Sequence, residues 1–198
     1  MSHPDIYAAI EPVVSVFEKL DIPYHIGGSV ASSALGVART TIDIDLVAEV
    51  HREHIEALIQ ALQEDYYIDA GMIADAIERR SSFNLIHFAT MLKVDVFIPK
   101  QSAYAREAFA RKRLDRLVEE SDDKYYIATA EDVILNKLDW YRMGGEVSER
   151  QWGDLVGVLK VQGEAIDMDY LRHWAAQLDL MPLLERALRE AHPSTDLP

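Results

Sequence analysis

The chain contains no cysteine, which excludes disulfide bonds, thiolate zinc sites and cysteine nucleophiles. It also lacks any apolar run approaching the roughly 18 to 20 residues that a membrane-spanning helix needs. The first residues, MSHPDIYAAIEPVV, do not have the basic and then apolar pattern of a secretion signal. No P-loop glycine motif and no serine nucleophile elbow is present. These absences predict a cytoplasmic protein that does not bind membranes.

Basic residues are scarce, with 20 lysines and arginines against 34 aspartates and glutamates and a formal net charge of −14. This balance argues against broad, nonspecific binding of nucleic acid and favours a cationic or protein partner. A locally basic surface stays open. The length of 198 residues suits a small catalytic domain with a helical unit after it.

Apolar spacing and turn residues predict a mixed sheet flanked by helices, because helical and strand patterns alternate along the first part of the chain. We expect, in order, a helix ending before Pro23, a strand at 24–26, a helix at 29–35, a strand at about 41–47, a helix through Ile55, Leu58, Ile59 and Leu62, an antiparallel hairpin of strands at about 83–89 and 92–98, a helix ending at 110, a hairpin across 113–127, and helices from about 131. The expected fold class is α+β (α/β), with a catalytic domain at 1–127 and a C-terminal helical bundle at 128–198.

Two carboxylates stand two residues apart in the apolar segment TTIDIDLV. In a strand, Asp43 and Asp45 share one face, while Ile44 and its apolar neighbours occupy the other. Carboxylates this close repel each other unless a cation lies between them, and Mg²⁺ accepts carboxylate oxygens together with substrate phosphates. The segment therefore indicates either a metal-bound phosphate site or a solvated edge strand.

A third acid, Asp95, lies in LKVDVFI, where the apolar residues Val94 and Val96 face the opposite side. Aspartate is a poor strand former and is rarely buried without a partner. If the two acid strands are neighbours, three carboxylates would hold two cations, Mg²⁺ or Mn²⁺. The alternative is that Asp95 pairs with Lys93 or Arg39 at a sheet edge.

The order of a Gly28-Ser29 turn, the paired acids Asp43 and Asp45 and the later acid Asp95 resembles the polymerase-beta-type nucleotidyltransferases. The resemblance implies that the turn opens a helix whose N–H groups bind a nucleoside triphosphate (NTP), as helix N-termini bind anions in general. It also implies that Asp43 and Asp45 bind both metals. Asp95 would bind the catalytic metal and help to deprotonate an acceptor hydroxyl.

A lysine interrupts the apolar stripe of EDVILNKLDWYR, and this places Lys137 on the inward side of a helix. It either extends its charge to solvent, pairs with a structural acid or reaches a nucleotide phosphate. Asp154 in RQWGDLVGVL stands where an antiparallel helix would bring it near Lys137, and it would orient the lysine. The rings of Tyr125, Tyr126, Trp140 and Tyr141 are interpreted as core or interface residues, with stacking of one ring on the nucleotide base as the alternative.

The motifs Lys93-x-Asp95-x-Phe97, Lys137 in a helix and an Arg-x-x-x-Asp154-Leu end are similar to those of the AbiE-type toxin nucleotidyltransferases and their MenT relatives. The R-x-T-x-D-I-D-L context beginning at Arg39 strengthens this resemblance. It implies that Arg39 and Lys137 join Gly28 and Ser29 in binding the nucleotide.

The leading hypothesis is therefore transfer of a nucleoside monophosphate from an NTP to a hydroxyl acceptor, with tRNA in a toxin-antitoxin pair as the favoured acceptor and an antitoxin protein as a partner. The GGSVASSALG segment is also similar to aminoglycoside and lincosamide nucleotidyltransferases, so a small cationic acceptor is an alternative. A noncatalytic member of the fold, binding a nucleotide or a partner, is a third. A tRNA acceptor requires local basic surface, and the candidate run is Arg106, Arg111, Lys112, Arg113 and Arg116. The alternative is that this run forms a solvated face.

Overall fold

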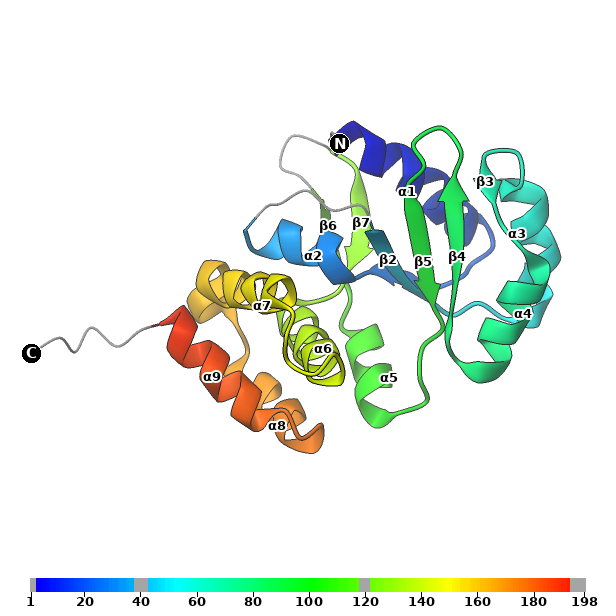
Figure 1. Cartoon of the computed structure of the whole chain (residues 1–198). Coiled ribbons are helices and arrows are strands. Elements are labelled where there is room, and N and C mark those ends of the chain that lie inside the picture. The colour runs from blue at the N-terminus through cyan, green and yellow to red at the C-terminus, as the bar shows by residue number, and fades with distance from the viewer. Residues whose placement is uncertain (1–2, 38–42, 118–121, 193–198) are drawn as a thin grey trace, which may run out of the picture.

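The computed structural model describes residues 3–37, 43–117 and 122–192. Within them, a central sheet carries helices on both faces (Figure 1). The strands are β1 (Tyr24–Ile26), β2 (Asp43–Ala48), β3 (Tyr66–Tyr67), β4 (Ser82–His87), β5 (Lys93–Phe97), β6 (Arg113–Arg116) and β7 (Lys124–Ile127). The α-helices are α1 (His3–Lys19), α2 (Gly28–Leu35), α3 (Ile55–Leu62), α4 (Ala70–Arg79), α5 (Ala103–Ala110), α6 (Ala130–Met143), α7 (Glu149–Gln162), α8 (Met168–Gln177) and α9 (Met181–Ala191). The predicted α+β class is confirmed.

The strand order across the sheet is β3-β4-β5-β2-β1-β7-β6. The two predicted hairpins, β4 with β5 and β6 with β7, are antiparallel, whereas β2 pairs with β5 in parallel. Both acid-bearing strands consequently lie inside the sheet with neighbours on either side. This position rules out the edge-strand alternatives, because an edge strand has a free hydrogen-bonding side.

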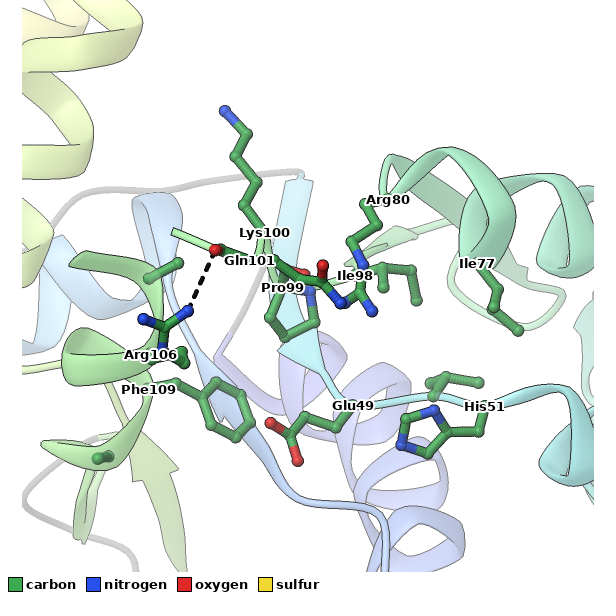
Figure 2. A pocket seen from close by; sticks show the side chains of 13 residues that line it. Glu49, His51, Ile77, Arg80, Ile98, Pro99, Lys100, Gln101, Arg106 and Phe109 are labelled. Atoms are coloured by element: carbon green, nitrogen blue, oxygen red, sulfur yellow. Dashed lines mark hydrogen bonds between the residues drawn. The ribbon is translucent and has the colours of Figure 1, made fainter. Parts of the chain in front are cut away.

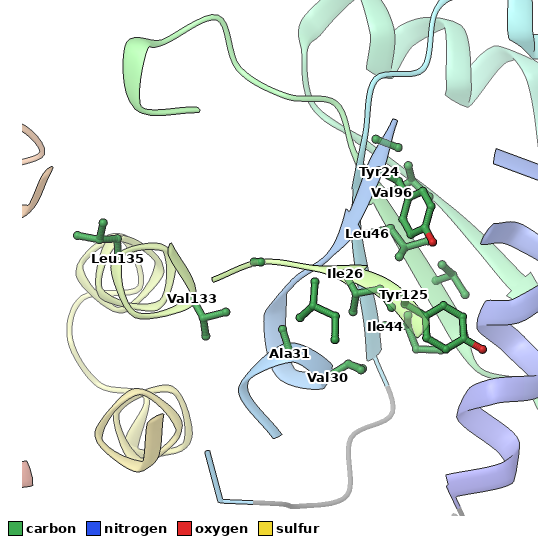
Figure 3. Close-up of a cluster of buried hydrophobic side chains, with 14 of the residues drawn as sticks. Tyr24, Ile26, Val30, Ala31, Ile44, Leu46, Val96, Tyr125, Val133 and Leu135 are labelled. Carbon is green, nitrogen blue, oxygen red and sulfur yellow. The ribbon is translucent and has the colours of Figure 1, made fainter. Parts of the chain in front are cut away.

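One face of the sheet is apolar and forms the main core. Alternation along β2 and β5 buries Ile44, Leu46, Val94 and Val96 completely, and α1 packs over them (Figure 3). The hydroxyl of Tyr66 donates to the carbonyl of Ala9 in α1 at 3.0 Å. Each such aliphatic side chain contributes about 1.5 to 3 kcal/mol when it leaves water. Burial of this face leaves the acids on the opposite one.

The region 66–79 had no predicted element. A two-residue strand such as β3 carries too little periodicity to recognise, and α4 buries only Ile73 and Ala76. Its start is fixed by a local contact, because the Asp69 side chain accepts a hydrogen bond from the N–H of Met72 at 2.8 Å. None of the helices in the described ranges has the length and apolar character to cross a bilayer.

The C-terminal helices α6–α9 gather on the side of the sheet away from α1 and α3 (Figure 1). Their link to the sheet domain includes a buried polar cluster around Arg111, at the end of α5. Its guanidinium lies 3.3 Å from Glu131, 3.9 Å from Asp132 and 3.7 Å above the ring of Tyr170. The Tyr170 hydroxyl donates to Asp132 at 2.8 Å. The boundary at 127/128 stays a prediction.

Replacing Arg111 with Met would leave Glu131 and Asp132, which are only 4% and 1% exposed, without their cation. We expect Arg111→Met to lower the free energy of unfolding by about 3 kcal/mol, because an uncompensated buried charge is costly. Urea denaturation measures the change, and Arg113→Met, at an exposed arginine nearby, is the matched control. Equal losses in the two variants would contradict a structural role for the cluster.

Candidate active site

The three predicted acids lie on the same face of two adjacent strands. Asp45 of β2 stands directly beside Asp95 of β5, and Asp43 stands beside Lys93. Because side chains directly opposite in a sheet are close neighbours, this register brings the first and third acids of the sequence pattern together. Asn84 of β4 continues the row on the far side of Asp95.

The predicted Gly-Ser turn lies against the same acids. The Gly27 N–H donates to the Asp45 carbonyl at 2.9 Å, and the Ser29 N–H contacts Asp45 Oδ2 at 3.4 Å. Gly28 has a φ of +54°, and a Cβ built there would lie 1.7 Å from Asp45 Oδ2. Only glycine fits at this close approach of the helix N-terminus to the carboxylate. The start of α2 therefore lies directly above Asp45.

The acids repel one another, and nearby cations offset the repulsion. Burial raises the pKa of Asp45, and the charges of Asp95 and Asp43 raise it further, while the Ser29 N–H and the Lys137 ammonium lower it. Lys93 Nζ lies 2.7 Å from Asp95 Oδ2, and this hydrogen bond raises the pKa of Lys93. The Asp95–Lys93 pair considered from the sequence thus exists, but on an interior strand.

The donor chemistry of this face fits a hard divalent cation. Asp43, Asp45 and Asp95 supply only carboxylate oxygens, the ligands that Mg²⁺ and Mn²⁺ prefer. A cation is already drawn to Asp95, since the Lys93 ammonium contacts it. Across the described ranges, no three histidine, aspartate or glutamate side chains converge as metal ligands. The metal set accordingly stays a prediction.

The C-terminal helices present a lysine and an aromatic ring to this face. Lys137 Nζ of α6 lies 2.8 Å from Asp154 Oδ2 of α7, with their side chains 8% and 7% exposed. The structure thus brings together the two residues that the sequence placed on neighbouring helices. Three residues after Lys137, the half-exposed ring of Trp140 lies edge-on to Phe97, with the ring centroids 6.0 Å apart.

Sequence reasoning missed the Phe97–Trp140 contact, because it links a strand to a helix 43 positions later. It also missed His25, which is buried on the acid face of β1 against the ring of Phe109, with the centroids 5.4 Å apart. The alternation of polar and apolar residues on a three-residue strand is too short a signal. Arg39 lies outside the described residues.

The candidate basic run 106–116 does not form one continuous surface. Arg111 belongs to the buried cluster, Arg116 pairs with Asp122 at 2.9 Å, and Lys112 Nζ lies 4.2 Å from the ring centroid of Phe109. Arg113 is exposed on β6, and the Arg106 guanidinium donates to the Gln101 carbonyl at 3.1 Å. These cations therefore point to several places.

Comparison with known proteins identifies the architecture. No protein-family model and no curated protein sequence matches the chain. The solution structure of the antibiotic-resistance factor ANT(2'')-Ia matches with a TM-score of 0.61 and 16% identity, covering 93% of this chain and 97% of that one. The chain has the nucleotidyltransferase fold.

Two further structures agree. An antigenic nucleotidyltransferase-like protein from Paracoccidioides brasiliensis matches with a TM-score of 0.55 and 14% identity, covering 96% of this chain and 94% of that one. A crystal structure of ANT(2'')-Ia in complex with adenylyl-2''-tobramycin matches with a TM-score of 0.55 and 14% identity, over 87% and 95%. At these identities the likeness establishes the fold alone, and the relation to AbiE-type toxins stays a prediction.

Two adjacent glycines provide a matched test of the turn. Alanine at Gly28 would need a positive φ and would collide with Asp45, whereas at Gly27, with φ −125°, nothing lies within 4 Å of an added Cβ. We expect Gly28→Ala to lower the free energy of unfolding by about 1 to 3 kcal/mol, and Gly27→Ala to have little effect. Urea denaturation distinguishes them. A fully stable Gly28→Ala protein would show that the close approach is not required.

Buried His25 makes stability depend on pH. Burial lowers its pKa from an ordinary 6.5 to about 4, so the unfolded chain takes up the proton first as the pH falls. The free energy of unfolding should therefore decrease as the pH drops from 6.5 to about 4, by about 3 kcal/mol from this group. In His25→Leu this slope should flatten, while the exposed-site control His192→Leu keeps it. Urea denaturation at several pH values across this range provides the measurement. An unchanged slope in His25→Leu would show that His25 is not the source of the pH dependence.

Proposed function

We propose that the protein is a metal-dependent nucleotidyltransferase that moves a nucleoside monophosphate from an NTP to a hydroxyl acceptor and releases pyrophosphate. The observation that carries the proposal is the placement of Asp45 and Asp95 side by side beneath the N-terminus of α2. A helix N-terminus attracts phosphate, and paired carboxylates attract the cation that accompanies a triphosphate.

Each group of the site takes a role that follows from its position. The N–H groups of Gly28 and Ser29 bind the phosphates that leave, since they lie on the α2 side of Asp45. Asp43, Asp45 and Asp95 hold Mg²⁺ or Mn²⁺, which when bound neutralises phosphate charge and orients the reacting oxygens. Asp95 takes the proton from the acceptor hydroxyl as the new P–O bond forms and the bond to pyrophosphate breaks.

Lys137 steadies the triphosphate, and Asp154 is its positioning residue. A buried lysine without an anion pays a desolvation penalty, and the 2.8 Å contact with Asp154 offsets it. The charge of Lys137 also acts on Asp45, whose pKa it lowers. We assign Arg39 to the nucleotide as well, from the sequence motif.

As the acceptor we favour tRNA, in a toxin-antitoxin setting with a protein antitoxin as partner. The support is the set of later motifs, above all the placement of Lys137 and Asp154 on successive helices. A small cationic acceptor is the second candidate. It is favoured by the net charge of −14 and by the likeness to ANT(2'')-Ia over 93% of the chain. A noncatalytic nucleotide-binding protein is the rival from another class.

Transfer of labelled α-phosphate from each of the four NTPs, with Mg²⁺, to total tRNA and separately to an aminoglycoside panel tests the proposal. We expect Asp45→Asn to reduce the rate by about a thousandfold or more, since the metal and phosphate contacts meet at Asp45. Lys137→Met should reduce it by about ten- to a hundredfold. The control is Lys160→Met at an exposed lysine of α7, which should retain activity.

The acceptor that takes up label identifies the substrate class. Label on tRNA supports the toxin-like candidate, and label on a drug supports the second one. If the wild type binds NTP but labels neither acceptor, and Asp45→Asn leaves the biological effect of the protein intact, the noncatalytic rival replaces this proposal.

A further inference from the structure

A pocket of about 440 Å³ lies beyond the carboxyl ends of β2 and β5, between α4 and α5 (Figure 2). Three cationic side chains line it, namely Arg80, Lys100 and Arg106. Glu49 is the one acid among the described residues of its lining, and His51 lies beside it. In a chain with a net charge of −14, this concentration of positive charge is unusual.

Two of the cations are held in the pocket wall by the backbone. Arg80, in the left-handed region with a φ of 48°, donates from Nη1 to the Pro99 carbonyl at 2.9 Å. Arg106 donates from Nη1 to the Gln101 carbonyl at 3.1 Å. A guanidinium carries five N–H donors, so each bond fixes the group and leaves donors for a ligand. Arginine in this state suits phosphate, which it binds through two parallel hydrogen bonds.

The pocket lies on the acceptor side of the reaction. In-line transfer puts the attacking hydroxyl opposite the leaving pyrophosphate. In the proposed reaction, pyrophosphate leaves at the N-terminus of α2, beside β1. In the sheet, β2 separates β1 from β5. The acceptor therefore approaches over β5, where Asp95 lies.

The pocket is also at a suitable distance from the acids. From Asp95 the chain reaches Pro99 in four residues, which in an extended strand is about 13 Å. Phe97 lies between them on the same face as Asp95, and its ring contacts the half-exposed Trp140. An acceptor reaching from Asp95 to the pocket thus passes an aromatic pair and then the pocket wall that holds Arg80 and Arg106, with the Lys100 side chain extending from its rim (Figure 2). An aromatic pair suits stacking with a nucleotide base, and the cationic pocket beyond it suits a phosphate group.

We infer that this pocket binds a phosphate group of the acceptor, and hence that the acceptor is a phosphate-bearing molecule such as an RNA end rather than a polycation. The inference rests on the proposed function for the direction of approach. The binding itself does not require turnover, so it is tested separately.

The test is fluorescence anisotropy with a labelled, 5′-phosphorylated RNA tetranucleotide. The double variant Arg80→Gln/Lys100→Gln should bind it at least tenfold more weakly than the wild type. The salt dependence should also become shallower, by about 1.4 in log–log slope for two lost charges on a single strand. Lys160→Gln/Arg172→Gln removes two exposed charges elsewhere and should bind within twofold of the wild type. Glu49→Gln should bind more tightly, because it removes the acid.

Competition identifies the source of the phosphate. If inorganic phosphate or a nucleoside monophosphate displaces the probe as well as an unlabelled tetranucleotide does, the acceptor is a small phosphorylated molecule. Much stronger displacement by the tetranucleotide indicates RNA.

Equal affinity of the pocket variant and the control, or binding of labelled neomycin in place of the RNA, would overturn the inference. Transfer activity separates the two proposals. An active wild type whose pocket variant binds RNA normally refutes the pocket alone. An inactive wild type that binds RNA through the pocket refutes the proposed function alone.

Discussion

The repulsion between Asp45 and Asp95 is the constraint on which the rest of this face depends. Two carboxylates in register on adjacent interior strands destabilise a sheet unless positive charge surrounds them. The protein supplies that charge from three directions: the α2 N-terminus, the Lys93 ammonium and Lys137. Each neutralises part of the charge, but burial still raises the pKa of Asp45. The negative charge that these groups leave uncompensated is the physical basis for expecting a divalent cation beside Asp45.

The C-terminal helices complete the site. The Lys137 ammonium of α6 acts electrostatically on Asp45 of β2, and one helical turn later the Trp140 ring contacts Phe97 of β5. Buried polar contacts add to the packing of α6 against its neighbours: Asp154 binds the lysine, and the buried cluster around Arg111 ties α5 to the starts of α6 and α8. These buried charged pairs fix the geometry of the site, because charged hydrogen bonds set orientation more strictly than apolar contacts do.

The sequence order of charged residues does not show where charge gathers in the folded chain. The basic residues within 106–116 separate in space, and one of them, Arg106, lines the pocket together with Arg80 and Lys100 from other parts of the chain. Local sequence therefore overstated the basic surface at the hairpin and understated it at the strand ends. The net charge of −14 governs which molecules the protein attracts at long range, whereas the fixed guanidiniums of the pocket govern which groups bind at close range.

The sequence by itself determined most of the elements and the acid face, because strand alternation places Asp43, Asp45 and Asp95 opposite buried aliphatics. That Gly28 lies against the Asp45 carboxylate, where no Cβ fits, was decided by the tertiary structure. The sequence also predicted the Lys137–Asp154 neighbourhood, since helical periodicity is a local property. The strand β3, the helix α4, the Phe97–Trp140 contact and the cationic pocket were decided by the tertiary structure alone. Strand order and crossover connections bring these residues together, and no local periodicity records which strand lies beside which.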